Sequence, residues 1–252
     1  MADSSSASSA NQPERGLAAL KQHVIEHKIS CGLWALRLLA MLFTLFYFIP
    51  LFGNPYNIYY KVLICNSAIN ALRLHQRMPP IQFTSAFFAE LSMEDSFHYL
   101  FYASVFLYAS PIALVLLPIF LFALLHFASY SLTLLDCLGQ NRMWAWRLMI
   151  SLVEFQSGNI LRFIAMIEII LLPISIFLVF SGRAGLLTPF IYYHFLSLRL
   201  KSRRNPYTRN VFYEIRNAIS AVAAKPSVPA IIRRLLTYFL QVVQVMEPVR
   251  QQ

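Results

Sequence analysis

The sequence has 252 residues, of which 58% are apolar and 15% aromatic, and its mean hydropathy is +0.56. This composition excludes an ordinary soluble domain, in which about 45–50% of the residues are apolar. The net charge of +10 would suit a nucleic-acid-binding protein, but 10 of the 21 Lys and Arg residues lie from Arg199 onward, directly after an apolar run. That placement is typical of a segment that binds anionic lipid, so we expect an all-α membrane protein with no nucleic-acid partner.

The N-terminal region offers one motif that resembles a metal site. Residues 1–16 are Ser-rich and predicted to be disordered. A helix is expected from Leu17 to Ile29, and it contains HVIEH at His23–His27, which matches the H-x-x-E-H pattern of inverted zinc peptidases. No downstream helix supplies an obvious third ligand, so a solvated helix face is the preferred interpretation. Because no nucleophile elbow or phosphate-binding loop occurs either, we predict no catalytic, cofactor-binding or metal residue and no enzymatic activity.

The first membrane segment is expected at Leu33–Phe52, where Pro50 and Gly53 end the apolar run. Tyr56–Arg77 then has the pattern of a helix with basic residues on its outer side, and the Pro79-Pro80 pair ends it. After it, Thr84 or Ser85 is a candidate cap for a short helix that reaches Leu91.

The run from Ser96 to Leu135 contains no Asp, Glu, Lys or Arg in forty residues. As one straight helix it would measure about 60 Å, twice what one crossing requires. Pro111 and Pro118 interrupt it on nearly the same helix face. The run is therefore predicted either to extend beyond the membrane or to fold back within it.

A second long run, Phe163–Leu198, is interrupted in the middle. Phe163–Ser181 is long enough to cross a membrane, and its only charged residue is Glu168. Gly182–Gly185 then forms a break before thirteen more apolar residues, which suit a return limb or an interfacial segment. An ionisable residue in a span is a functional-site hypothesis by default. Pairing of Glu168 with Arg162 or with a lipid headgroup is the preferred alternative to transport or catalysis.

The segments around these runs bear on topology. With ordinary crossings, two segments would lie on opposite sides of the membrane, namely Asn54–Asp95 and Asp136–Arg162, and one of them should be poor in basic residues. Instead, each segment carries three Lys or Arg residues. Our hypothesis is that both long runs are hairpins that enter and leave on the cytosolic face. Ordinary crossing is the rival interpretation, and three to four membrane segments are expected in all.

Residues 17–198 are thus predicted to form a helical membrane domain, and residues 199–252 a basic cytosolic tail. The tail residues predicted to contact lipid headgroups are Arg199, Lys201, Arg203, Arg204, Arg209, Arg233 and Arg234. A helix is expected around Val211–Val222, and a second one at Ala230–Met246. The apolar face of the second helix comprises Ile231, Ile232, Leu235, Leu236, Phe239, Leu240, Val243 and Met246. Such a face predicts a helix lying in the membrane plane, with packing on the protein's own core as the alternative.

Four stretches resemble the transmembrane protein 33 family, which includes Krüppel-homologue and fungal pore-membrane members. They are ALRLHQR at Ala71–Arg77, MEDSFHYL at Met93–Leu100, NILRFIAMIEI at Asn159–Ile169 and, most specific, FSGRAGLLTPFIYYHFLSLRLKSRRNPYTR at Phe180–Arg209. The resemblance implies a protein of the endoplasmic reticulum (ER) and nuclear envelope without known catalysis. It implies roles in shaping tubular ER together with reticulons, in nuclear-pore assembly, and in stress signalling and calcium homeostasis. The family's amphipathic membrane-binding helix maps onto Ala230–Met246.

Two functions follow as expectations. The first is a non-enzymatic membrane shaper, since hairpins and an in-plane helix add area to one leaflet. The second is a regulator or subunit of an ER ion channel, which would rest on Glu168 and His126. A pore should place several polar residues along one face of its spans, and here such residues are nearly absent. The first function is therefore preferred.

Overall fold

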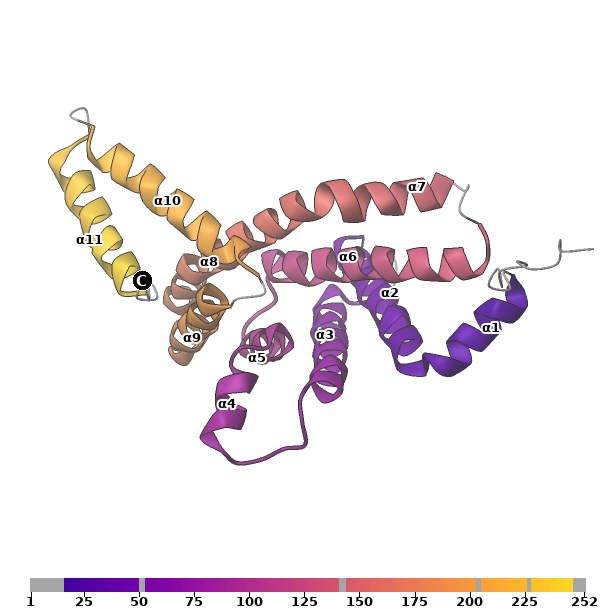
Figure 1. Cartoon of the computed structure of the whole chain (residues 1–252). Helices are drawn as coiled ribbons and strands as arrows, with labels where there is room; N and C mark the ends of the chain where they lie inside the picture. Colours follow the sequence, from indigo (N-terminus) through magenta and orange to yellow (C-terminus); the bar gives the residue numbers. More distant parts are fainter. Residues whose placement is uncertain (1–15, 50–52, 141–143, 203–204, 226–227, 247–252) are drawn as a thin grey trace, which may run out of the picture.

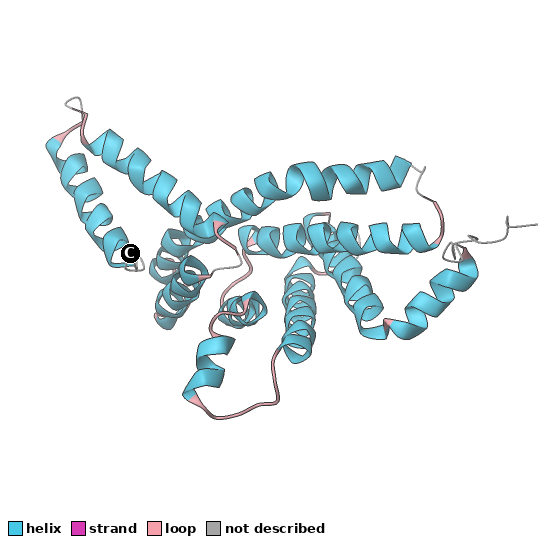
Figure 2. Ribbon diagram, viewed as in Figure 1, coloured by secondary structure: helices cyan, strands magenta, loops and turns pink. Residues whose placement is uncertain are grey.

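The computed structural model is a set of helices joined by short loops (Figure 1). It describes residues 16–49, 53–140, 144–202, 205–225 and 228–246, and no strand occurs in these ranges (Figure 2). The predicted all-α class is therefore confirmed. Apart from Gly16, the Ser-rich head lies outside the described residues.

The N-terminal half follows the predicted order of elements. It contains α1 (Leu17–Glu26), α2 (Lys28–Phe48), α3 (Pro55–Arg77) and α4 (Ser85–Leu91). Asn54 caps α3, where its side-chain oxygen accepts a hydrogen bond from the Tyr56 amide at 2.9 Å. The predicted cap at Thr84 is confirmed, since its hydroxyl accepts from the Phe87 amide at 3.2 Å.

The forty-residue uncharged run breaks once. It forms α5 (Asp95–Leu107) and α6 (Ala113–Cys137), with Pro111 in the connection and Pro118 inside α6. Figure 1 shows α5 nearly end-on and α6 from the side, so the two helices meet at a corner. The run therefore changes direction at Pro111, whereas Pro118 stays within α6. The predicted hairpin stays a prediction.

The next helical stretch begins earlier than the sequence predicts. α7 (Trp144–Ile150), a π-helical turn (Ser151–Gln156) and α8 (Ser157–Phe180) follow one another without a break. The polar composition up to Leu161 favoured an interfacial segment, with the membrane run starting at Phe163. The structure corrects this boundary because the polar side chains here are compatible with continued helical hydrogen bonding.

The remaining helices agree with the predicted pattern. α8 ends at the predicted break, where Gly182 has a φ of +70°, a conformation that glycine adopts without a Cβ clash. α9 (Leu187–Lys201), α10 (Tyr207–Ala223) and α11 (Ala230–Met246) follow. Within the described ranges, three helical stretches are long and apolar enough to cross a membrane, namely Lys28–Phe48, Ala113–Cys137 and Trp144–Phe180.

Two connections between helices and the start of α3 meet at one end of the molecule. The Tyr60 hydroxyl, near the start of α3, donates to the Ala109 carbonyl at 3.4 Å. The Ser110 amide in the same connection donates to the Arg183 carbonyl, between α8 and α9, at 3.0 Å. We call this the turn end. Behind it lies an aromatic core whose fully buried members include Tyr59, Tyr102, Phe106, Tyr192 and Phe195.

Candidate functional site: a buried polar network and an amphipathic helix

Away from the turn end, Glu168 forms the centre of a buried polar network. Its side chain is 0% exposed, and that of Arg199 is 1% exposed. Arg199 Nε lies 3.1 Å from one carboxylate oxygen of Glu168 and 3.2 Å from the other. Arg199 Nη1 reaches Asp95 Oδ1 at 3.0 Å. One arginine from α9 therefore joins an acid on α8 to an acid at the start of α5.

Hydroxyl groups complete the coordination of the Glu168 carboxylate. Thr208 Oγ1, from the first turn of α10, donates to Oε2 at 3.0 Å, and the Tyr99 hydroxyl donates to Oε1. The Tyr192 hydroxyl binds the Glu168 backbone carbonyl at 2.8 Å. A buried carboxylate is tolerated when it is paired and hydrogen-bonded in this way. Four helices, α5, α8, α9 and α10, thus converge on one side chain.

The electrostatics of the network keep Arg199 charged. Burial by itself lowers the pKa of Arg199, but Glu168, Tyr99 and Asp95 together raise it above its ordinary value. Since Glu168 already receives a guanidinium and two hydroxyl donors, its carboxylate holds the helices together. This geometry is that of a structural ion pair.

Two predictions about these residues were wrong. Arg199 was predicted to contact lipid headgroups, but its guanidinium is buried, because its two acidic partners lie in the interior. Arg162, considered as a partner of Glu168, instead pairs with Glu214 on α10 at 2.5 Å. A usable signal was present in the sequence. Glu168 lies twelve positions before the end of α8 and Arg199 twelve positions after the start of α9, so they face each other across the turn.

The other predicted headgroup residues have varied positions. Lys201, Arg233 and Arg234 are exposed, and Arg209 is half-buried. Arg203 and Arg204 lie outside the described residues. The predicted lipid contact of these six residues stays a prediction.

The predicted amphipathic helix α11 leaves much of its apolar face uncovered. Ile231 is 76% exposed and Leu235 66% exposed, Ile232 is exposed too, and Leu236 and Leu240 are half-buried. The side chains of Phe239, Val243 and Met246 lie outside the described residues. Figure 1 shows α10 and α11 as a pair that extends away from the other helices. Val211 and Phe212, near the start of α10, are buried, so this end of the helix pair is packed against the rest of the protein.

The structure does not arrange the HVIEH motif, His23–His27, as a metal site among the described residues. In the described ranges no group of three His, Cys, Asp or Glu side chains is placed to hold a metal ion. His23 Nε2 instead lies 3.1 Å from the Tyr130 hydroxyl on α6.

A family model and several individual proteins match this chain, and all of them point to the same family. The family model "Transmembrane protein 33/Nucleoporin POM33" matches residues 12–249. "Krueppel homolog 2" of Drosophila melanogaster is 48% identical over 225 residues, which cover 88% of this chain and 82% of the relative. Human "Transmembrane protein 33" is 40% identical over 86% of this chain and 89% of its own length. "Transmembrane protein 33 homolog" of Caenorhabditis elegans is 38% identical over 87% of this chain and 82% of its own length.

No solved structure matches this chain. The family model spans nearly the whole sequence, and the relatives are similar in length and well above 30% identical. The chain therefore belongs to the transmembrane protein 33/POM33 family.

Proposed function

We propose that this chain is a non-enzymatic membrane protein of the ER and nuclear envelope that helps to organise tubular ER and nuclear pores. The observation that carries the proposal is the apolar face of α11, where Ile231 and Leu235 are exposed beyond the helical body. A helix of this kind gains free energy by burying its apolar side at the headgroup level. The word "Nucleoporin" in the description of the matching family supports a role at pores.

Helix lengths supply a second source of curvature. α5 has 13 residues and α9 has 15, which correspond to roughly 20 Å and 22 Å of helix, whereas the hydrocarbon core is about 30 Å thick. The helices α6 and α8, which meet α5 and α9 at the turn end, are long enough to cross. Each long run therefore has one short and one long limb, and the short limbs add area to one leaflet only. In this proposal α11 inserts into the same leaflet, and the short limbs and α11 together favour a membrane curved toward that face.

The proposed partners are anionic lipids and two classes of membrane-associated protein. Anionic lipids suit the exposed Lys201, Arg233 and Arg234. Reticulons and nuclear-pore proteins are proposed as protein partners from the family resemblance. Ion conduction is less favoured, because the intramembrane acid on which it would rest, Glu168, is already held by Arg199 and Thr208.

Reconstitution of the full-length protein tests this function. Ile231→Asp with Leu235→Asp places two charges on the exposed apolar face, and Thr237→Asp with Gln241→Asp adds the same charge to exposed positions on the polar side. In liposomes of phosphatidylcholine and phosphatidylserine, we expect the wild type and the polar-side control to produce tubules or smaller vesicles. The apolar-face variant should leave vesicle diameters unchanged, as measured by electron cryo-microscopy. Equal remodelling by both variants, or none by the wild type, would refute the proposal.

A further inference from the structure

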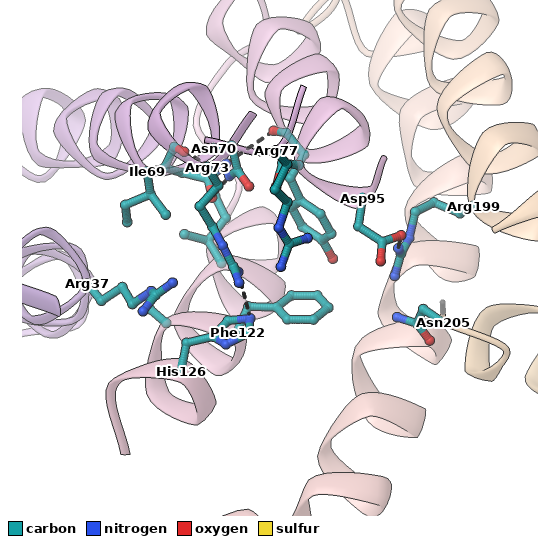
Figure 3. A pocket seen from close by; sticks show the side chains of 15 residues that line it. Arg37, Ile69, Asn70, Arg73, Arg77, Asp95, Phe122, His126, Arg199 and Asn205 are labelled. Atoms are coloured by element: carbon teal, nitrogen blue, oxygen red, sulfur yellow. Dashed lines mark hydrogen bonds and ion pairs between the residues drawn. The ribbon is translucent and has the colours of Figure 1, made fainter. Parts of the chain in front are cut away.

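A cavity of about 220 Å³ lies beside the buried polar network, between α2, α3, α5, α6 and α9 (Figure 3). Its basic lining comprises Arg37, Arg73, Arg77, Arg199 and His126. Among the described residues that line it, Asp95 is the sole carboxylate. A partly open space lined by four guanidinium groups and one carboxylate has a positive potential.

Two of the four arginines have acidic partners. Arg199 is held by Glu168 and Asp95, and Arg77 Nη1 lies 3.5 Å from Glu94. Asp95 is shared further, since it accepts the Ser202 hydroxyl at 2.9 Å. The carboxylates near the cavity are thus already engaged with these two arginines.

The other two arginines form no such ion pair with a described residue. Burial lowers the pKa of Arg73, and the charges of Asp95 and Glu94 oppose this only in part. Arg73 Nη1 lies 3.0 Å from His126 Nε2, and a neutral imidazole accepts this bond without supplying negative charge. Arg37 is only 7% exposed, and it makes no hydrogen bond or ion pair with any residue in the described ranges. Figure 3 shows its guanidinium directed into the cavity, on the same side as His126. Arg199 Nη2 is also buried there without a partner among the described groups.

A buried guanidinium without a counter-ion costs several kcal/mol, and an anion bound in the same space would offset that cost. The planar guanidinium fork binds phosphate oxygens with two parallel hydrogen bonds. The geometry points to a binding site for a phosphate group in this cavity, with Arg37 and Arg73 as its ligands. The group belongs either to an anionic lipid headgroup or to a free phosphate, and it is independent of the membrane face of α11.

The test uses the full-length protein, delipidated in a neutral detergent. The probes are inorganic phosphate, dioctanoyl phosphatidic acid and, as a lipid without phosphate, dioctanoylglycerol. We expect saturable binding of at least one phosphate-bearing probe, measured by calorimetry, and none of dioctanoylglycerol. Arg37→Gln with Arg73→Gln should weaken binding at least tenfold, or about 1.4 kcal/mol. Lys21→Gln with Lys28→Gln removes two exposed charges of the same sign and should leave the affinity unchanged.

The probes separate the two sources. Binding of phosphatidic acid alone assigns the site to a lipid headgroup, binding of phosphate alone assigns it to a soluble anion, and binding of both assigns it to the phosphate group itself. No binding by either, or equal affinity in the double variant, overturns the inference.

A stability measurement covers the case in which the double variant fails to fold. Arg37→Gln removes an uncompensated charge, so it should raise the unfolding temperature of the ligand-free protein and abolish the further rise that the probe produces. A purely structural Arg37 predicts the opposite, namely a lower unfolding temperature with the response to the probe retained. That result would also overturn the inference.

Discussion

Arg199 and Glu168 show how a single ion pair can organise a helical membrane protein. Each side chain would be costly in an apolar interior by itself, and each is the main partner of the other. The network also includes Asp95 and Thr208, so it joins segments from both halves of the chain. Its removal should therefore affect the whole fold.

Neutralising one partner of the pair should be far more damaging than neutralising both. We expect Glu168→Gln or Arg199→Gln to lower the free energy of unfolding by roughly 3–5 kcal/mol, because the remaining charge is left buried. The double replacement Glu168→Met with Arg199→Met should recover much of this loss. Thermal unfolding of the detergent-solubilised protein gives the comparison.

The control is the exposed pair Arg162–Glu214, which joins α8 and α10 at the surface. Arg162→Gln should cost less than about 1 kcal/mol, as exposed pairs usually do. If Arg199→Gln is no more harmful than Arg162→Gln, the buried network does not stabilise the fold.

At the scale of elements, the sequence predicts helices better than it predicts their contacts. The ranges of α10 and α11 follow from apolar residues at helical spacing, and the break between α8 and α9 follows from Gly182 and Gly185. The start of the long α7–α8 stretch was missed, because hydropathy marks where apolar residues begin, and backbone hydrogen bonding extends further into polar sequence.

The site was harder to predict than the elements. Arg199 stands at the end of an apolar run and beside Lys201, so its local pattern is that of a residue reaching the membrane surface. Its burial depends on direct contact with Asp95, over a hundred positions earlier, and on Glu168, which Thr208 in the next helix also binds. Local periodicity contains no information on such distant contacts.

The turn between α8 and α9 offers a matched pair of glycine substitutions. Gly182 has a φ of +70°, whereas Gly185 has no unusual φ, and a Cβ at either position meets no atom within 4 Å. We expect Gly182→Ala to lower the free energy of unfolding by about 1–2 kcal/mol through backbone strain alone. Gly185→Ala should be close to neutral. Equal melting temperatures for the two variants would show that the turn relaxes freely.

At the scale of the molecule, the two ends differ in charge. Arg77 at the end of α3 and Lys201 at the end of α9 lie at the network end, and Arg37 and Arg73 line the cavity there. The turn end holds Arg183, Lys61 next to Tyr60, and the exposed Tyr108, so it has fewer basic residues than the network end. The positive-inside rule therefore predicts that the network end faces the cytosol.

Cysteine accessibility tests this orientation, with Cys31, Cys65 and Cys137 replaced by Ala. Met93→Cys and Gln140→Cys flank the run of α5 and α6, and both should react with a membrane-impermeant maleimide in intact microsomes. Tyr108→Cys, at the turn, should resist the reagent even after permeabilisation, because the short α5 leaves the turn inside the bilayer. Labelling of Tyr108→Cys only after permeabilisation would instead establish a full crossing. Protection of either flanking site in intact microsomes would contradict the hairpin.

The position of Arg199 within the chain has a consequence for biosynthesis. Domains form from the N-terminus as the ribosome delivers them, so Asp95 and Glu168 enter the translocation machinery before their shared arginine has been made. Likewise, the Ser110 amide can donate its hydrogen bond to the Arg183 carbonyl only after Arg183 has been synthesised. Until α9 and the start of α10 emerge, Glu168 lacks the guanidinium and the Thr208 hydroxyl that hold its carboxylate in the folded protein. We therefore expect products truncated before Arg199 to be retained by membrane chaperones and degraded, even though all three long apolar helices are already complete.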